Sequence, residues 1–356
     1  MKEYNIALIP GDGIGGDVID EGMRVVCAAA DAFGFGVRSE SFPWSCAYYQ
    51  EHGRMMPADG LDALRGFDAI YLGAVGWPTV PDHISLWELL LPIRKTFEQY
   101  ANVRPVRLFP GLQGPLHGKT SDDINFVCVR ENTEGEYAGL GGRAHQGTPY
   151  ELAIQTDLFT RTGVERVMRF AFELAQRRNK KLTAATKSNA SRYSFVFWDE
   201  VFAELSADYP DVETEKWHVD ALAARFVTRP EAFDVVVASN LFGDILTDLG
   251  GAIQGSLGTA ASANLSPQRV GPSMFEPVHG SAPDIVGRGI ANPIGAIWAG
   301  AMMLEHLGEE QAGAAIVAAI ERLTSEGTTL TRDLGGSAST SDVGKAIAAY
   351  VREQAG

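Results

Sequence analysis

The stretch Phe233-Asp-Val-Val-Val-Ala-Ser-Asn-Leu-Phe-Gly-Asp-Ile-Leu-Thr-Asp248 predicts a buried strand that runs directly into a helix. Asp244 and Asp248 stand four residues apart, a spacing that stacks two side chains on one face of a helix. Without a cation between them, such a pair faces water at a helix N-terminus, where the helix dipole favours anions. The alternative is a pair that holds a hard divalent cation through its oxygen atoms. Taken alone, the spacing favours the solvated pair.

Short apolar runs and longer helical patterns alternate along the rest of the chain. The strand-like runs cover 6–9, 69–72, 124–129, 182–186 and 235–238, and the helical patterns cover 18–33, 165–177, 292–307 and 309–327. This alternation predicts an α/β protein with a mixed, largely parallel sheet. The turn-rich segment 140–149 and the alternating segment 151–156 interrupt it, and they predict a hairpin arm suited to pairing with a second subunit.

Length and charge narrow the functional classes. A chain of 356 residues exceeds the usual size of one hydrophobic core, so two domains are expected. A net charge of −15 argues against nucleic-acid and anionic-membrane partners, which require a basic surface. The three cysteines fit neither a disulfide framework nor a zinc site, so buried free thiols are expected. With no signal-like segment and no run of eighteen apolar residues, a soluble cytoplasmic protein is expected.

A glycine-rich loop, Gly11-Asp-Gly-Ile-Gly-Gly16, follows the first predicted strand and opens into a helix. Glu40 lies in the next predicted strand, where a ribose ligand would be expected in a Rossmann dinucleotide site. Backbone amides of this loop could hold a pyrophosphate. A tight turn that needs glycine for positive φ explains the same letters. The motif alone leaves both interpretations open.

A second candidate nucleotide site lies in Glu276-Pro-Val-His-Gly-Ser-Ala-Pro-Asp-Ile285 and Ile290-Ala-Asn-Pro293. His279 could stack on or hydrogen-bond an adenine, and Gly280 and Ser281 would let the backbone approach closely. Asp284 could accept hydrogen bonds from both hydroxyls of a ribose and would repel a 2′-phosphate, which favours NAD over NADP. A surface loop punctuated by Pro and Gly is the alternative, and loop chemistry alone slightly favours it.

Arg94, Arg104 and Arg130 lie in or at the ends of predicted elements, and arginine suits bidentate recognition of carboxylates. A single arginine is more often a surface residue whose stem covers apolar neighbours. Three in so acidic a protein, however, justify the hypothesis of a site for an anionic substrate.

Three further residues could carry chemistry. Tyr137 could act as a general acid if its hydroxyl reached a substrate, although most tyrosines are structural. Lys187 follows strand 182–186, at the carboxyl end where α/β proteins keep their ligand sites, and nearby cations would ease the loss of its proton. Asp220 could add a third carboxylate for a metal, although by itself it is an ordinary helix or loop acid.

Taken together, the motifs resemble those of the β-decarboxylating dehydrogenases, the isocitrate/isopropylmalate dehydrogenase family. The resemblance covers nearly the whole chain through Ile9-Pro-Gly-Asp-Gly-Ile-Gly15, Leu72-Gly-Ala-Val-Gly76, Tyr100-Ala-Asn-Val-Arg-Pro105, Arg130-Glu-Asn-Thr-Glu-Gly-Glu-Tyr137, Thr186-Lys-Ser-Asn189, Asn240-Leu-Phe-Gly-Asp-Ile-Leu-Thr-Asp248 and His279-Gly-Ser-Ala-Pro-Asp284. Several specific motifs in the same order are stronger evidence for a family than one glycine loop. They reverse the preference at Asp244 and Asp248, from a solvated pair to a pair that binds a divalent cation.

The resemblance implies roles for the matching residues. The substrate carboxylates would be bound by Arg94, Arg104 and Arg130, with Trp87 and Leu90 in the same pocket. Mg²⁺ or Mn²⁺ would be bound by Asp220, Asp244 and Asp248, and protons would be moved by Tyr137 and Lys187, so that Tyr137, Lys187 and Asp220 form the catalytic set. NAD would lie against Ile14, Glu276, His279, Gly280, Ser281, Asp284 and Asn292. The cofactors implied are NAD and the divalent metal, and a monovalent cation such as K⁺ is a possible further cofactor.

The resemblance also implies a three-layer α/β/α fold that is not a Rossmann fold, with two domains around a cleft. Residues 1–100 and 255–356 would form a discontinuous domain carrying most of the NAD site. Residues 101–254 would form a central domain with the dimer interface, the metal and catalytic residues and an arm at about 140–156. Lys187 and Asp220 would enter the site of a second subunit, which makes a homodimer necessary. The glycine loop, with Ile14 near the nicotinamide, would have a supporting role.

Within the family the chain looks most like the tartrate and D-malate dehydrogenase branch. Glu88 and Leu90 stand where isocitrate enzymes place Ser and Asn, and an added acid would repel a third carboxylate. Trp87 replaces an acid that is usual in isopropylmalate enzymes and would shorten the apolar slot. Pro92 departs from the expected helix, because proline cannot donate a backbone hydrogen bond.

The expected activity is therefore NAD- and metal-dependent oxidative decarboxylation of a malate-type 2-hydroxy acid. D-malate would give pyruvate and CO₂, and tartrate could be oxidised as well or instead. The enzymatic alternative is a 3-isopropylmalate dehydrogenase of leucine synthesis. A catalytically inactive regulatory subunit is the alternative from another class, although no metal or proton-transfer residue is missing from the motifs.

Overall fold

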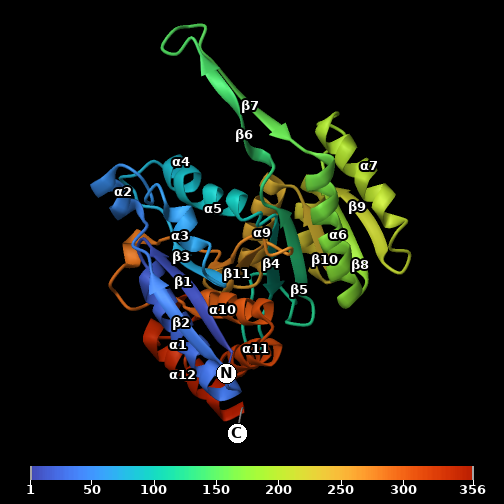
Figure 1. The fold of residues 1–356 in the computed structure, drawn as a ribbon. Coiled ribbons are helices and arrows are strands. Elements are labelled where there is room, and N and C mark those ends of the chain that lie inside the picture. Colours follow the sequence, from blue (N-terminus) through green and yellow to red (C-terminus); the bar gives the residue numbers. More distant parts are fainter. Residues whose placement is uncertain (1, 355–356) are drawn as a thin grey trace. The chain divides into compact units, whose positions relative to one another are not determined.

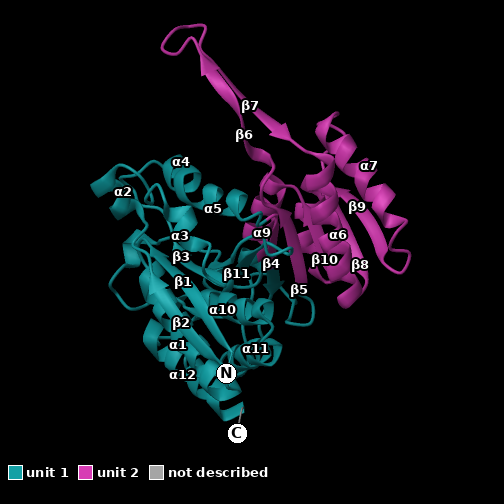
Figure 2. Cartoon of the chain, in the orientation of Figure 1, with its two compact units in different colours: residues 1–99, 105–124, 251–356 teal, residues 100–104, 125–250 magenta. Residues whose placement is uncertain are grey.

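The computed structural model describes residues 2–354, which group into two compact units (Figures 1 and 2). Unit 1 is built from both chain ends, Met1–Gln99 and Gly251–Gly356, together with Pro105–Ile124. Unit 2 comprises Tyr100–Arg104 and Asn125–Gly250. Strand β4, Ala101–Arg107, therefore contributes to both units. Residues 105–124, which the sequence analysis placed in the central domain, belong to unit 1.

The strands of unit 1 follow the order β2-β1-β3-β12-β11. All neighbours are parallel except β11 and β12, which makes the sheet mixed as expected. Their bounds are Glu3–Gly11 for β1, Gly36–Ser41 for β2, Ala69–Ala74 for β3, Ala261–Leu265 for β11 and Ser273–Pro277 for β12.

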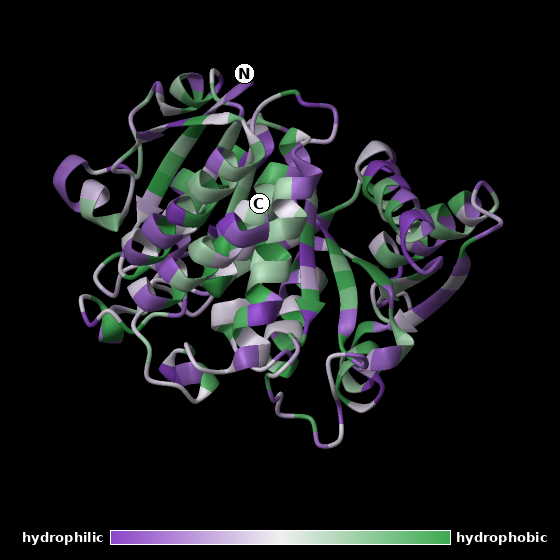
Figure 3. Cartoon of the chain, turned by 90° about the horizontal axis from the view of Figure 1, so that it is seen from below, coloured by the Kyte–Doolittle hydropathy of each residue, from purple (hydrophilic) through white to green (hydrophobic). Residues whose placement is uncertain are grey.

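Helices cover both faces of this sheet. On strand β3, Ile70 and Leu72 join a buried cluster that includes Trp44 of the α2 region and Phe97. Tyr71, between them in sequence, faces the other way and donates a hydrogen bond to Ala296 O on α10 (2.5 Å). Alternate side chains of the strand thus pack into two cores, one on each face of the sheet. The unit therefore has three layers, with helices on both sides of the sheet. Figure 3 shows hydrophobic residues in green along the strands and mixed purple and green on the surrounding helices.

The helices of unit 1 are α1 (Gly15–Phe33), α2 (Cys46–His52), α3 (Gly60–Leu64), α4 (Asp82–Ser85), α5 (Leu91–Thr96), α10 (Ile294–Leu307), α11 (Glu310–Glu326) and α12 (Thr340–Gln354). A π-helical turn, Leu86–Leu90, connects α4 to α5. Pro92 lies in the first turn of α5 and has no N–H to donate to the residue four before it. The wider turn, in which Leu91 N–H bonds Leu86 O, is one way in which helices accommodate such a disruption.

Unit 2 has a parallel sheet in the order β5-β10-β8-β9. Its elements are β5 (Asn125–Glu131), β8 (Lys181–Thr186), β9 (Glu213–His218), β10 (Val235–Ala238), α6 (Arg161–Arg177), α7 (Ser194–Ser206), α8 (Val219–Thr228) and α9 (Asn240–Ile253). All four residues of β10 are buried, and Phe126 of β5 packs edge-on against Phe226 of α8. The strand-to-helix transition expected at 233–248 is confirmed.

A hairpin of β6 (Gly135–Ala144) and β7 (Leu152–Leu158) extends from unit 2 (Figure 1). Its apolar side chains at Leu140, Leu152 and Ile154 are 44–59% exposed in the single chain.

Two global expectations can also be compared with the described residues. Cys46 and Cys128 are buried, but Cys27 is exposed, so the expectation of buried thiols was wrong for Cys27, which lies on the outer side of α1. Within residues 2–354, no helix combines the length and the apolar character needed to cross a membrane.

Candidate functional site

The carboxyl ends of two parallel strands build the main site of unit 2. The register pairs Arg130 at the end of β5 with Ala238 at the end of β10, and α9 begins two residues later at Asn240. A Cβ at Gly243 would overlap with the Arg130 side chain, so glycine is needed for α9 to lie this close to β5. Strand ends of this kind carry ligand sites in α/β proteins.

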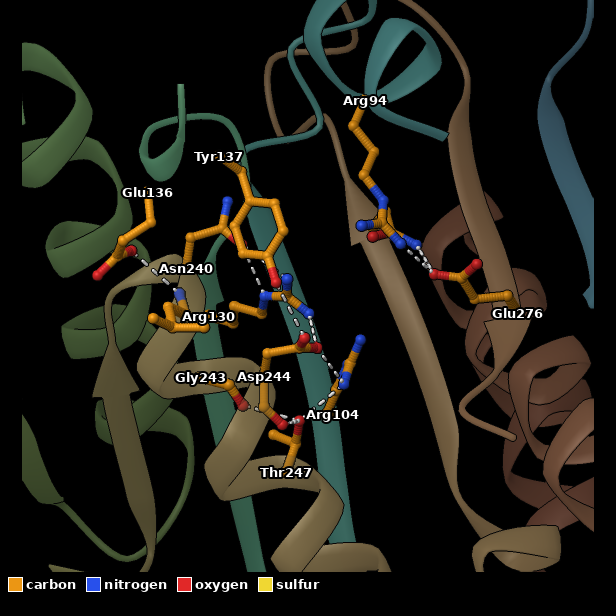
Figure 4. A network of polar contacts seen from close by, with 12 residues as sticks. Arg94, Arg104, Arg130, Glu136, Tyr137, Asn240, Gly243, Asp244, Thr247 and Glu276 are labelled. Atoms are coloured by element: carbon orange, nitrogen blue, oxygen red, sulfur yellow. Dashed lines mark hydrogen bonds and ion pairs between the residues drawn. The ribbon is translucent and has the colours of Figure 1, made fainter. Parts of the chain in front are cut away.

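Asp244 is the centre of this site (Figure 4). Its Oδ1 accepts hydrogen bonds from Nη1 of Arg130 and from Nη1 of Arg104, the latter at 3.4 Å. Its Oδ2 accepts a hydrogen bond from the Tyr137 hydroxyl at 3.4 Å. Thr247 fixes Arg104 by accepting a second, shorter hydrogen bond from Nη1 (2.7 Å). Both arginines are almost fully buried, so their charges lie in a medium that strengthens electrostatic interactions.

Asp248 lies one turn further along α9 and is exposed to solvent. Partial burial of its carboxyl and then the negative charge of Asp244 raise the pKa of Asp248 above its ordinary value of 3.8, although Arg104 and Arg130 oppose this. Helix α9 has no acidic residue in its first turn, so neither carboxylate lies where the helix dipole acts. The alternative of a solvated pair at a helix N-terminus does not match this position, because Asp244 lies four residues after Asn240, where α9 begins.

The donor chemistry therefore fits a hard divalent cation. Asp244 and Asp248 share one helix face. Partial burial and the charge of Asp244 disfavour the anionic form of Asp248. A bound cation would relieve both effects. Within the described part of the chain, no three His, Cys, Asp or Glu side chains come together in a metal-binding arrangement.

Tyr137, from β6, is half-buried and lies beneath the Arg130 guanidinium, whose carbon is 5.6 Å from the ring centre. Burial first, and then the charge of Asp244, raise the pKa of Tyr137 above its ordinary value of 10.0. The hydroxyl is therefore protonated at neutral pH and is able to donate a proton or a hydrogen bond.

Lys187 and Asp220 form a separate pair in unit 2. The register pairs Thr186 with His218 at the ends of β8 and β9, which brings the following residues together. Lys187 Nζ donates to Asp220 Oδ1 at 2.7 Å, and this hydrogen bond is the main reason that the pKa of Asp220 is lowered. The Asp220 side chain is 68% exposed, so the pair is open to approach from outside.

Arg94 of unit 1 forms an ion pair with Glu276 of β12 (Figure 4). Nη2 of Arg94 lies 2.8 Å from Glu276 Oε1, which also accepts from Asn264 Nδ2 (2.8 Å). Both charged side chains are almost fully buried. The Nε atom of Arg94 is buried without a hydrogen-bond partner, so the guanidinium keeps an unused donor.

Trp87 and Leu90 both lie in the π-helical turn that precedes Arg94. Trp87 is 37% exposed, and the Lys95 ammonium lies 5.2 Å from its ring centre. Leu90 is partly buried and packs against the core cluster below α5.

The glycine loop is closed by hydrogen bonds within the protein. The Asp12 N–H donates to Ala74 O (2.7 Å), and the Ile14 N–H donates to Ser281 O (2.9 Å). The Asp12 carboxylate is buried and accepts hydrogen bonds from the backbone N–H groups of Cys46 and Gly76. These groups are therefore not arranged for a pyrophosphate, which the buried carboxylate would repel. This agrees with the expected absence of a Rossmann site.

The same loop nevertheless supports the second nucleotide candidate. Gly13 has φ +60°, and a Cβ there would overlap with the Ser281 carbonyl. Ile14 is buried in a small cluster with Val18 and Ala291, and Ala282 packs against that cluster. Ala282 itself has a left-handed backbone (φ 42°), a strained conformation for a residue with a side chain.

His279, Asn292 and Asp284 lie around this strained loop. Burial is the main cause that lowers the pKa of His279, and its Nε2 atom is buried without a hydrogen-bond partner. The Asn292 amide is fixed by donating to Asp333 Oδ2 (2.9 Å) and accepting from Ile294 N–H (3.0 Å). Asp284 is exposed in a short 3₁₀ turn, and Gly280 has open space where a side chain would stand. A neutral imidazole with an unused nitrogen suits an adenine partner.

Several residues of these sites escaped the sequence analysis. They are Asp12 in the glycine loop, Glu136 and Asn240 around the start of α9, Thr247 beside Arg104, and Asp333 beside Asn292. The first four lie inside motifs that were quoted only for their neighbours. Asp333 lies far along the chain from Asn292, and no sequence signal connects the two.

Comparison with known proteins places these sites in a family. The model of the isocitrate/isopropylmalate dehydrogenase family matches residues 5–347. The chain is 58% identical to the D-malate dehydrogenase [decarboxylating] of Escherichia coli (strain K12), covering 98% of each chain. It is 54% identical to the tartrate dehydrogenase/decarboxylase of Pseudomonas putida, covering 97% of this chain and 96% of the relative.

A solved isocitrate dehydrogenase from Methylococcus capsulatus is similar in structure, with a TM-score of 0.87 and 36% identity over 98% of this chain and 99% of the other. Enzymes of the family use NAD and a divalent metal ion and act on small dicarboxylates. The match to the family model spans nearly the whole chain, and the two relatives named above cover it almost completely. This chain therefore belongs to the isocitrate/isopropylmalate dehydrogenase family.

Proposed function

We propose that this enzyme oxidises and decarboxylates D-malate to pyruvate and CO₂ with NAD⁺, and that it oxidises tartrate as well or instead. The observation that carries this proposal is the convergence of Arg104, Arg130 and Tyr137 on Asp244, beside Asp248. Relatives named as D-malate and tartrate enzymes, at 58% and 54% identity, support the choice of substrate.

Arg104 and Arg130 bind the substrate carboxylates in this proposal, together with Arg94. Each is at most 7% exposed and is held by another side chain before substrate arrives. A guanidinium that is already oriented loses little conformational entropy when it forms a bidentate pair with a carboxylate. Trp87 and Leu90 contact the part of the substrate beyond its malate core.

Asp244 and Asp248 hold Mg²⁺ or Mn²⁺, with Asp220 supplied by a second subunit. When bound, the metal provides Lewis-acid stabilisation of the negative charge that develops on the substrate oxygen. A monovalent cation such as K⁺ is a further expectation from the family, to which we assign no residue.

Two side chains move protons. Lys187 accepts the proton of the C2 hydroxyl, directly or through water, as hydride leaves for NAD⁺. Tyr137 then donates its proton to the carbon from which CO₂ has departed. Its raised pKa suits it to this role, because the hydroxyl stays protonated at neutral pH. Asp220 orients Lys187 through their 2.7 Å hydrogen bond.

NAD binds along the loop from Glu276 to Asn292. The unused Nε2 of His279 is available to the adenine, and the exposed Asp284 accepts from the ribose hydroxyls. Gly280 and Ser281 allow close backbone approach, while Ile14 contacts the nicotinamide end. The carboxylate of Asp284 disfavours a 2′-phosphate, so NAD is preferred over NADP.

The active enzyme is a homodimer in this proposal. Lys187 and Asp220 form an exposed pair, so both can reach the site of another copy. The β6–β7 hairpin carries exposed apolar residues that a second hairpin would cover. The central domain, which is unit 2 in this structure, thus supplies the interface and the catalytic residues, and the two chain ends supply most of the NAD site.

The test is NAD⁺ reduction with D-malate, L-tartrate and 3-isopropylmalate, each with Mn²⁺ and with a chelator. We expect the highest kcat/KM with D-malate or tartrate, and loss of activity with chelator. Preference for 3-isopropylmalate would make this a leucine-synthesis enzyme. No turnover of any of the three would favour an inactive regulatory subunit.

A further inference from the structure

We infer that Asn240 is a positioning residue that orients Arg130 for the substrate carboxylate, an inference that rests on the proposed role of Arg130. The Asn240 side chain, at the start of α9, accepts two hydrogen bonds on Oδ1, from Arg130 Nε (3.0 Å) and Nη2 (2.7 Å). Arg130 Nη1 bonds Asp244 instead. Asn240 and Arg130 are 1% and 3% exposed, so this contact is shielded from water (Figure 4).

The orientation of the Asn240 amide is determined by its surroundings. A guanidinium can only donate, so the oxygen must face Arg130. The nitrogen faces the other way and donates to Glu134 O at 3.2 Å, on the turn that leads to Tyr137. The backbone around Asn240 is also held, because Leu241 N–H donates to Glu136 Oε2 (3.3 Å). One side chain therefore connects β5, the turn before β6 and the helix that carries the two carboxylates.

The neutrality of Asn240 is the functional part of this arrangement. It fixes one edge of the guanidinium without adding a negative charge beside it. A carboxylate at position 240 would satisfy the same two donors but would compete electrostatically with the carboxylates of a substrate. Binding of a substrate and a cation must change the pairing of Arg130 with Asp244, whereas the pairing with Asn240 can persist. Asn240 is thus the contact that holds Arg130 in place through turnover.

The experiment compares Asn240→Ala in two backgrounds, the wild-type chain and Arg130→Lys, which lacks the forked donor edge. The affinity for D-malate is measured by calorimetry with Mn²⁺ present, and KM for NAD is measured in parallel. We expect Asn240→Ala to weaken D-malate binding about tenfold in the wild-type background, because a buried charged donor loses its partner. In the Arg130→Lys background we expect a change of less than about twofold, since the edge that Asn240 holds is already absent.

Two further variants sharpen the test. Asn240→Asp should also weaken D-malate binding, although it keeps the acceptor, because it adds a charge. Thr183→Val is the matched control: Thr183 is fully buried in the same unit, and its hydroxyl donates to Glu215 Oε1 (2.9 Å). This variant should leave D-malate binding and the KM for NAD unchanged.

An equal loss of affinity in both backgrounds, or a lowered melting temperature with unchanged D-malate binding, would mean that Asn240 is only structural. A crystal structure of Asn240→Ala provides a readout that does not depend on turnover. We expect the Arg130 guanidinium to be displaced, and an unmoved guanidinium would overturn the inference. If the wild-type enzyme binds neither D-malate nor tartrate, the proposed function fails, and the crystal structure still decides the role of Asn240.

Discussion

The two buried arginine sites of this molecule differ in how their charges are balanced. In unit 1, Arg94 faces the single carboxylate of Glu276, and Asn264 supports that carboxylate from another side. In unit 2, Arg104 and Arg130 share Asp244, and Asp248 adds a second carboxylate on the same helix face. The first site is a one-to-one ion pair. The second is a cluster in which two arginines share one carboxylate and a second carboxylate lies on the same helix face.

The difference separates a pair that stabilises the fold while it orients Arg94 for the proposed substrate from a cluster whose charges a bound ligand would balance. A buried one-to-one pair is costly to break, because either partner becomes an uncompensated charge. In the cluster, partial burial and the charge of Asp244 raise the pKa of Asp248, so its carboxylate form is disfavoured when no cation is bound. A divalent cation and an anionic substrate would complete the cluster.

The largest effect is expected for Asp248→Asn. Turnover with D-malate and Mn²⁺ should fall roughly a thousandfold, because a bound metal supplies several kcal/mol of transition-state stabilisation. The affinity for NAD, measured by fluorescence of bound NADH, should not change. The melting temperature without metal should not decrease, because the variant removes a disfavoured charge. Turnover near the wild-type level would mean that Asp248 is a solvated residue and not a metal ligand.

The next largest effect is expected for Glu276→Gln, which breaks the pair in unit 1. Both side chains are less than a tenth exposed, so the free energy of unfolding should fall by about 3 kcal/mol. Denaturant unfolding provides the measurement. As a control, Glu353→Gln removes the exposed partner of Arg322 and should have no measurable effect. Equal results for the two variants would contradict the description of Arg94 and Glu276 as a stabilising pair.

A smaller and more selective effect is expected for Tyr137→Phe. Loss of a positioned general acid should slow pyruvate formation from D-malate roughly a hundredfold, whereas NADH formation should be spared more. The ratio of the 2-oxo diacid to pyruvate released per NADH measures this separation. If NADH and pyruvate formation fall by the same factor, Tyr137 is not the acid of the decarboxylation step.

The smallest effect concerns pH. The pKa of Asp248 is raised in the folded protein, so its contribution to stability is present below its ordinary value of 3.8 and is lost as pH rises through the folded pKa. Without metal, the melting temperature of the wild type relative to Asp248→Asn should therefore decrease above this pH, by at most about 2 °C. Mn²⁺ should reverse the trend, because it binds the deprotonated form. The same decrease with and without Mn²⁺ would argue against a metal at Asp248.

Periodicity and motif order predicted a large part of the fold. The strand that ends at Ala238, the helix that follows and the mixed, largely parallel sheet are confirmed. The exact start of α9 at Asn240 could not be predicted, because strand and helix ends depend on backbone hydrogen bonds that sequence spacing does not reveal. The π-helical turn could not be predicted either. Pro92 signalled only that the helix would be disturbed.

The candidate site divides in the same way. Motifs identified Arg104, Arg130, Tyr137 and Asp244, and the structure brings them together. The partners that hold them, such as Thr247 and Asn240, are ordinary polar residues whose role depends on a close approach in three dimensions. The glycine loop shows the opposite failure, because its letters fit a pyrophosphate site while its amides already bond protein carbonyls.

The central claim is that each metal site joins Asp244 and Asp248 of one subunit to Asp220 of another. Mixing Asp248→Asn subunits with Asp220→Asn subunits tests it most directly, after dissociation and reassembly, with D-malate, NAD⁺ and Mn²⁺. Each hybrid dimer would contain one intact shared site, so the mixture should regain about a quarter of the wild-type turnover. If hybrid dimers form but the mixture is as inactive as either variant alone, the site lies within one subunit and the account is contradicted.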